Sequence, residues 1–224
     1  MDEIIPPLNA AEVRVLSALI EKAVTTPEYY PLSLGALTNA CNQLSNRDPV
    51  VSFEESDVTR SLDALRAKRL VTQFHGADNR VAKYKHGLTD ILLLTPAELA
   101  VLCVLMLRGP QTLGELRTRT ERLYKFAALT DVEETLVALS IRQPRPLVTK
   151  LPRQFGLKEA RYAHLFSGQP DSTVEETASS ATIPPPRSPD DKDRIAKLED
   201  ETASLRSEVE VLKQQVADLK RQWE

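Results

Sequence analysis

The chain has few of the residue types that disulfide, metal and redox chemistry require. Its 224 residues include two cysteines and three histidines. Cys41 and Cys103 are too few for a disulfide framework, and no zinc-ligand spacing is present. Both cysteines lie on apolar helical faces, where core packing is commoner than nucleophilic chemistry. The sequence also lacks the G-x-S-x-G, phosphate-loop, dinucleotide-glycine and H-E-x-x-H patterns. We therefore expect no metal, no cofactor and no enzymatic activity.

Long apolar runs and a strong charge of one sign are also missing. The longest apolar run, Leu99 to Leu107, is too short to span a bilayer. The start, MDEIIPPLN, is acidic and has no apolar segment, so we expect no signal peptide, no membrane contact and a cytoplasmic, reduced protein. The net charge of −3 creates no global field that attracts nucleic acid. The charge is uneven, however: −2 over residues 1–90, +4 over 91–168 and −5 over 169–224.

The most informative stretch runs from Asp57 to His86. Val58, Leu62 and Leu65 have the spacing of an amphipathic helix. An extended segment follows, then the turn residues 76–79 and a second segment that alternates in the manner of a strand. A helix followed by a hairpin is the second half of a winged-helix module.

The same pattern occurs twice along the chain. Four blocks recur in the same order, which predicts two copies of one helix-helix-helix-hairpin unit. The alternative is that helical proteins simply share a leucine-rich texture. We predict that Leu16, Leu62 and Leu65 lie in one core and that Leu102, Leu136 and Leu139 lie in the other. The clearest matches place Leu94, Glu98, Val101, Leu102 and Leu105 opposite Leu8, Glu12, Val15, Leu16 and Leu19, and Asp131, Val132, Leu136 and Leu139 opposite Asp57, Val58, Leu62 and Leu65.

The predicted fold class is mainly α with small β-hairpin wings (α+β), in two tandem winged-helix domains before a C-terminal coiled coil. Asn9 with Glu12, and Thr95 with Pro96 and Glu98, predict the starts of the first helix of each unit. The predicted domains are 1–90 and 91–168, followed by a disordered linker over 169–191 and a coiled coil over 192–224. The remaining predicted helices are Ser33 to Cys41, Ser56 to Lys68, Thr112 to Lys125 and Asp131 to Ile141, with a long wing tip from Lys150 to Glu159.

The last part of the chain changes character twice. Residues 169–191 are rich in Ser, Thr, Pro and Glu and predict a disordered linker. A heptad repeat then begins, with mostly β-branched residues at position a and leucine at position d, which favours a parallel two-stranded coil. The flanking charges are complementary between identical chains, so self-pairing is favoured over a foreign partner; the alternative is a lone amphipathic helix. The seam consists of Ile195, Leu198, Leu205, Val209, Leu212, Val216 and Leu219, with Thr202 as a polar a residue.

Three further blocks are more specific than periodicity. They are Tyr30-Pro31-Leu32-Ser33 with residues 39–49 (NACNQLSNRDP), residues 107–117 (LRGPQTLGELR) and residues 158–165 (KEARYAHL). Together they resemble the YceH-like bacterial family, a group of uncharacterised tandem winged-helix proteins. The resemblance runs from about Leu8 to Gly168 and implies the fold without implying an activity. This chain has Leu44 where a basic residue is expected in that family.

Two kinds of partner are compatible with these units. Winged helices usually present their third helix to the DNA major groove and the wing to phosphates. The outward face of the helix Ser56 to Lys68 is mixed, and the basic residues of the second unit could grip phosphates without reading bases. The alternative is a solvated or salt-bridged surface. The candidate nucleic-acid-binding residues are Arg60, Arg66, Lys68, Arg80, Lys83, Arg117, Arg119, Arg122, Arg153 and Lys158.

The third helix of the second unit points to a protein partner. Its outward positions hold Glu134, Val137 and Ile141, which do not favour a phosphate-lined groove. Two functions therefore stand: a DNA-associated regulatory or architectural protein, slightly favoured by the fold, or an assembly or adaptor protein. His86 and His164 occupy the same place in each unit. A structural hydrogen-bonding role tied to the adjacent tyrosine is favoured over a shared metal site.

The heptad repeat generates a direct prediction. Residues 192–223 should form a parallel homodimeric coil about 48 Å long at 1.5 Å per residue. Leu205→Asp with Leu212→Asp places charges in the seam and should give a monomer by light scattering, while residues 1–168 stay folded. A double variant that remains dimeric would assign the dimer to the helix-hairpin units instead.

Overall fold

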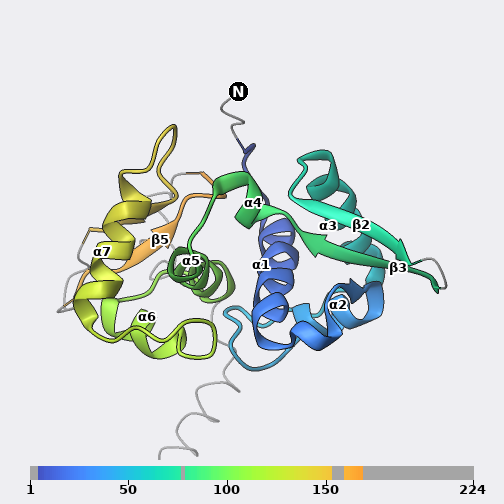
Figure 1. Ribbon diagram of the computed structural model, residues 1–224, viewed down its shortest axis with the longest axis horizontal. Helices are drawn as coiled ribbons and strands as arrows, with labels where there is room; N and C mark the ends of the chain where they lie inside the picture. The colour runs from blue at the N-terminus through green and yellow to red at the C-terminus, as the bar shows by residue number, and fades with distance from the viewer. Residues whose placement is uncertain (1–4, 77–78, 153–158, 169–224) are drawn as a thin grey trace, which may run out of the picture. The chain divides into compact units, whose positions relative to one another are not determined.

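The computed structural model describes residues 5–76, 79–152 and 159–168, which belong to one compact unit (Figure 1). They form a mixed α and β structure of helices and small antiparallel sheets, in agreement with the predicted α+β class. The predicted linker and coiled coil, including the seam residues from Ile195 to Leu219, lie outside the described residues.

The first repeat contains three α-helices followed by a hairpin. Helix α1 spans Ala10–Thr25, α2 spans Leu34–Cys41 and α3 spans Glu55–Ala67. Strands β2 (Val71–Gly76) and β3 (Asn79–His86) form the hairpin, and the short strand β1 (Leu32–Ser33) pairs with the other edge of β3. The sheet order is therefore β1-β3-β2, with a bulge between Phe74 and Gly76. A short 3-10 helix, η1 (Pro27–Tyr29), joins α1 to β1.

The second repeat follows the same order with shorter strands. Helix α4 (Leu88–Leu92) leads into α5 (Pro96–Arg108), α6 (Leu113–Arg119) and α7 (Leu129–Ser140). Strands β4 (Val148–Lys150) and β5 (Tyr162–His164) pair antiparallel. Gln111 forms an isolated bridge to Tyr162, in the place that β1 takes in the first repeat. Three helices and a hairpin thus occur in both halves.

The predicted helix starts are confirmed in atomic detail. The Asn9 side chain accepts a hydrogen bond from the Glu12 backbone N–H, and the Glu12 carboxylate accepts one from the Asn9 N–H, each at 2.9 Å. Thr95 and Glu98 form the same reciprocal capping box at α5, with Pro96 at its first position. Each box satisfies backbone donors that a helix start would otherwise leave unpaired.

The core is continuous across the two repeats. Leu16, Leu62 and Leu65 are buried, as predicted, and so are Leu102, Leu136 and Leu139. The two groups were predicted to lie in separate cores, but they belong to one hydrophobic cluster. The reason is that α1 packs against α5, as the centre of Figure 1 shows. Both helices are buried along most of their length, α1 from Glu12 to Glu21 and α5 from Glu98 to Leu107.

Because α1 is buried on all sides, its polar side chains need partners inside the protein. Glu21 forms an ion pair with Arg47 at 2.6 Å, and the Arg47 side chain is fully buried. Arg47 also donates to the carbonyl oxygen of Ala40 at 2.8 Å and to the Gln43 amide oxygen at 3.1 Å. Arg14 donates to the carbonyl oxygen of Pro49 at 2.7 Å. These bonds fix the loop between α2 and α3 onto α1.

One predicted helix is wrong in extent. Thr112 to Lys125 was predicted as a single helix, but α6 ends at Arg119. The buried Thr120 hydroxyl donates to the Leu116 carbonyl at 2.7 Å, and the Leu123 N–H donates back to the Thr120 carbonyl at 2.7 Å. The chain turns here, and Phe126, which follows the turn, is buried in the core. Helix α4 and strand β1 were not predicted, since both are too short to show a periodicity.

The buried ion pair gives a test of how the loop is held. Glu21→Gln leaves the Arg47 charge buried without its counterion, and should lower the free energy of unfolding by about 3 kcal/mol. Asp63→Asn is the matched control, because it breaks the exposed pair with Arg66 and should cost less than about 1 kcal/mol. Urea denaturation of the full chain measures both. Equal effects of the two substitutions on the free energy of unfolding would contradict the stabilising role given to the Glu21–Arg47 pair.

Candidate binding surfaces

The outward face of α3 carries charges that largely neutralise one another. Its exposed residues include Arg60, Asp63 and Arg66, as predicted. Arg60 lies 3.5 Å from Asp57, and Arg66 lies 3.2 Å from Asp63, each pair one turn apart. Such exposed pairs are weak and can reopen. Their net effect is still to cancel the field that would draw this helix to a phosphate backbone.

Lys68, at the end of α3, is held by the start of α1. Its ammonium lies 2.6 Å from the Glu12 carboxylate and donates to the Pro7 carbonyl oxygen at 3.1 Å. The Glu12 carboxylate is almost fully buried. Of the nucleic-acid-binding candidates on α3, Lys68 is therefore the one whose charge is engaged most firmly inside the protein.

The first hairpin carries its basic residues on β3. Lys85 is exposed and Lys83 is half-buried, and Lys83 pairs across the sheet with both Ser33 and Phe74. Arg80 lies on the same strand, and its side chain is outside the described residues. Arg153 and Lys158, on the predicted wing tip of the second repeat, also lie outside them. A phosphate-binding role for these wing residues stays a prediction.

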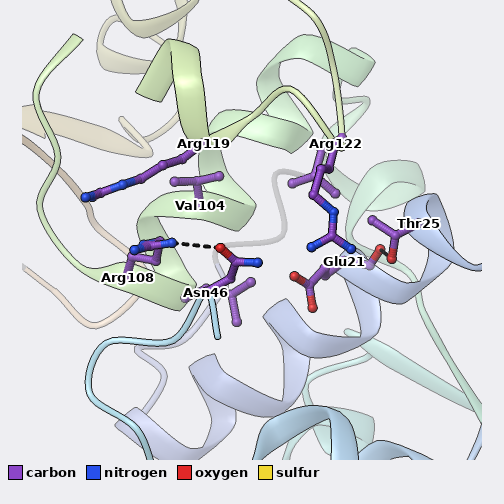
Figure 2. Close-up of a pocket in the computed structure, with 9 residues that line it drawn as sticks. Glu21, Thr25, Asn46, Val104, Arg108, Arg119 and Arg122 are labelled. Carbon is purple, nitrogen blue, oxygen red and sulfur yellow. Dashed lines mark hydrogen bonds between the residues drawn. The ribbon is translucent and has the colours of Figure 1, made fainter. Parts of the chain in front are cut away.

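The basic residues of α6 and the following turn do not form one patch. Arg117 is exposed and donates to the Ala127 carbonyl oxygen at 3.2 Å. Arg119 forms an ion pair with Glu115 at 3.2 Å. Arg122 points toward Glu21 of α1, while Arg119 points away from it (Figure 2).

Arg119 and Arg122 help to line a small pocket between the two repeats. Its volume is about 30 Å³, the share of liquid that one water molecule occupies. Glu21 and Asn46 come from the first repeat, and the Asn46 amide oxygen accepts a hydrogen bond from Arg108 at 2.8 Å (Figure 2). The charges at this junction therefore stabilise contact between the repeats, and the pocket has little room for a ligand.

The outward face of α7 is different in kind, because it is aliphatic and acidic. Val137 is 50% exposed and Ile141, directly after the helix, is 69% exposed, as predicted. Leu129 adds a third exposed apolar side chain at 43%. Glu133 and Glu134 lie exposed between them. Residues three and four apart are neighbours on a helix, so these side chains form one surface, which we call the α7 face.

Sequence reasoning missed part of the α7 face. Leu129 and Glu133 were not predicted, although the helix containing Glu134 and Val137 was. The prediction began that helix at Asp131, but the Asp131 carboxylate accepts from the Ala128 N–H at 2.9 Å, so α7 begins at Leu129. Reading Asp131 as the third position of the helix would have included Leu129.

The two equivalent histidines and the two cysteines were also considered as candidate site residues. His86 and His164 occupy equivalent strand ends, and the Nδ1 atom of each is buried without a hydrogen-bond partner among the described residues. The imidazole hydrogen bonding that was predicted is therefore absent at Nδ1. The Tyr30 hydroxyl instead accepts from the His86 backbone N–H at 2.7 Å. Cys41 and Cys103 are buried in the core, as predicted.

Within the described ranges, two classes of site find no support. No group of three His, Cys, Asp or Glu side chains there is placed to hold a metal ion. No helix in those ranges is both long and apolar enough to cross a membrane.

The fold and surfaces thus define an α+β protein built from two helix-hairpin repeats around one core. Comparison with known proteins places it in a family. The model of the family described as "Protein of unknown function, DUF480" matches residues 8–157. UPF0502 proteins are similar along nearly the whole chain. The UPF0502 protein of Opitutus terrae is 54% identical over 205 residues, which cover 92% of this chain and 86% of the relative. The UPF0502 protein of Geotalea uraniireducens is 55% identical over 217 residues, which cover 97% of this chain and 98% of the relative. The UPF0502 protein of Aliivibrio salmonicida is 48% identical over 215 residues (94% and 97%). The chain belongs to the DUF480 (UPF0502) family.

The two histidines, each with a buried Nδ1 atom, generate a pH prediction. Burial lowers the pKa of His86 and of His164 from an ordinary 6.5 to about 4. A depressed folded pKa means that the unfolded chain takes up protons first, so stability is lost as the pH falls below about 6.5. Each histidine should reduce the free energy of unfolding by about 2 kcal/mol between pH 7 and pH 5. Urea titrations at both pH values should show a smaller loss in His86→Gln and His164→Gln; an unchanged loss would contradict this origin.

Proposed function

We propose that this protein is a non-enzymatic, tandem winged-helix binding protein that docks another protein through the α7 face. A winged helix is a three-helix bundle followed by a β-hairpin, with a short strand before the second helix completing the sheet. The sheet order β1-β3-β2, and the Gln111–Tyr162 bridge beside β4 and β5, support this assignment for both repeats. We also infer that the YceH-like group and the DUF480 family are one family.

The observation that carries the proposal is the composition of the α7 face. In a winged helix, the third helix is the usual recognition element. Here that helix presents Leu129, Val137 and Ile141 to solvent with Glu133 and Glu134 among them. Carboxylates repel a phosphate backbone, and exposed aliphatic side chains that lie together mark protein contact sites. The partner that fits is a protein segment with aliphatic side chains flanked by lysine or arginine, because the flanking glutamates require opposite charge.

DNA association remains a second candidate, and a specific observation favours it. Lys85, Arg122 and Lys125 are exposed, and Lys83 lies on the same strand as Lys85. They could contact phosphates without reading bases. The paired charges on α3 and the acidic α7 face argue against sequence recognition by either third helix. The tail would serve both functions, because a coiled-coil dimer raises the local concentration of the second body once the first is bound.

The test begins with site-specific cross-linking in bacterial cells that produce the protein. A photo-cross-linking residue at Val137 should give a discrete adduct with one protein, and the same residue at Thr59 on α3 should not. The cross-linked segment of the partner should contain aliphatic residues flanked by basic ones. Val137→Asp with Ile141→Asp should weaken binding of the purified partner at least about tenfold, the loss of roughly 1.4 kcal/mol.

The matched control uses the equivalent positions of the first repeat. Asp63 and Ala67 correspond to Val137 and Ile141, so Ala67→Asp adds a charge to α3 and should leave partner binding unchanged. Purified protein should bind random duplex DNA weakly at physiological salt. Tight, strongly salt-dependent duplex binding that survives the α7 substitutions, with no discrete adduct at Val137, would overturn the proposal in favour of DNA association.

A further inference from the structure

A second pocket lies further along the α1–α5 contact, toward the start of α5; it shares Leu123 with the pocket in Figure 2 but is lined differently. Its volume is about 200 Å³. Three parts of the chain line it: α1, the α4 region with α5, and the turn after α6. The lining residues are Ile20, Val24, Thr89, Leu94, Pro96, Leu99, Ala100, Cys103 and Leu123.

The lining is apolar and carries no charged side chain. Thr89 supplies its one hydroxyl. The Cys103 thiol already donates to the Ser17 carbonyl oxygen at 3.6 Å. A buried water needs two to four polar partners, whereas an apolar cavity of about 150 Å³ stays dry and takes up benzene. The chemistry of the walls therefore favours an apolar occupant over water.

The pocket reaches the surface and has a defined floor. Val24, on the rim, is 40% exposed, whereas Leu99, Ala100 and Cys103 of α5 are buried. The small side chain of Ala100 leaves part of the space free, since its neighbours along α5 are larger. Ligand sites have this form: a concave, mostly apolar space with a few polar groups that fix orientation.

We propose that this pocket binds a small uncharged ring compound with a single hydroxyl group, such as a phenol. The ring would lie against Leu99, Ala100 and Leu123, and the hydroxyl would bond to Thr89. A carboxylate or an amine is excluded, because no lining residue offers a counter-charge and an unpaired buried charge is costly. The ligand would contact the first helix of both repeats, α1 through Ile20 and α5 through Ala100, which gives it a direct influence on how the repeats pack.

Three probes on the full chain test the chemical class. Phenol and benzene should each raise the Tm in a saturable manner, because a ligand that binds the folded state stabilises it. Benzoate, which has the same ring and a charge, should not. In methyl-labelled protein, NMR shifts on adding benzene should centre on Ile20, Val24, Leu94, Leu99 and Leu123. Shifts confined to other methyl groups, or the absence of any saturable effect of phenol and benzene, would overturn the proposal.

Two variants test the site itself. Ala100→Leu fills the space and should weaken phenol and benzene binding at least about tenfold in calorimetry. Thr89→Val keeps the shape and removes the hydroxyl, so it should weaken phenol about fivefold, the worth of one net hydrogen bond, and leave benzene unchanged. Ala138→Leu, on the exposed side of α7, is the control and should change neither. Equal binding of phenol and benzene by wild type and Ala100→Leu would refute the site. If Ala100→Leu does not fold, the NMR shifts and the phenol affinity of Thr89→Val decide whether the ligand occupies this pocket.

Discussion

The packing of α1 against α5 is the contact on which the rest of the structure depends. It joins the first helices of both repeats and merges two groups of core leucines into one cluster. Burial of α1 on every side forces its polar residues to find internal partners. Glu21 therefore pairs with Arg47, and Arg14 bonds to the carbonyl of Pro49, which fixes the long loop between α2 and α3. Asp48 in that loop then donates its N–H to the Leu107 carbonyl at 2.9 Å, so the same loop also holds α5.

This arrangement decides which surfaces are free to bind. With α1 and α5 in the centre, α3 and α7 lie on opposite sides of the described unit (Figure 1). The two third helices are therefore separated by the central pair α1 and α5. Their chemistry differs too, since α3 carries paired charges and the α7 face carries exposed aliphatic residues among glutamates. The two repeats therefore offer two distinct surfaces.

The two pockets along the α1–α5 contact differ in the residues that line them. Around the smaller one, Arg108 donates to the Asn46 amide oxygen across the junction, and Arg122 points toward Glu21 (Figure 2). The larger one has apolar walls and leaves its volume free. A ligand there would act on the contact that organises the fold, and through it on the relative placement of α3 and α7. The proposed ligand pocket and the proposed docking face on α7 would be connected through α5, which packs against both α1 and α7.

Elements whose signals are local could be predicted from the amino-acid sequence. Asn9 with Glu12, and the spacing of Val58, Leu62 and Leu65, depend on neighbours within a turn or two, so the start of α1 and the buried face of α3 could be predicted from the sequence. The sequence also identified Val137 and Ile141 as outward-facing. Contacts between residues far apart in the chain became visible only in the folded structure. Lys68 looked like a free cation until α1 placed Glu12 beside it, and the leucines of two repeats looked like two cores until α1 met α5. Ion pairs and cavities of this kind are formed by residues far apart in the sequence, so neither periodicity nor spacing predicts them.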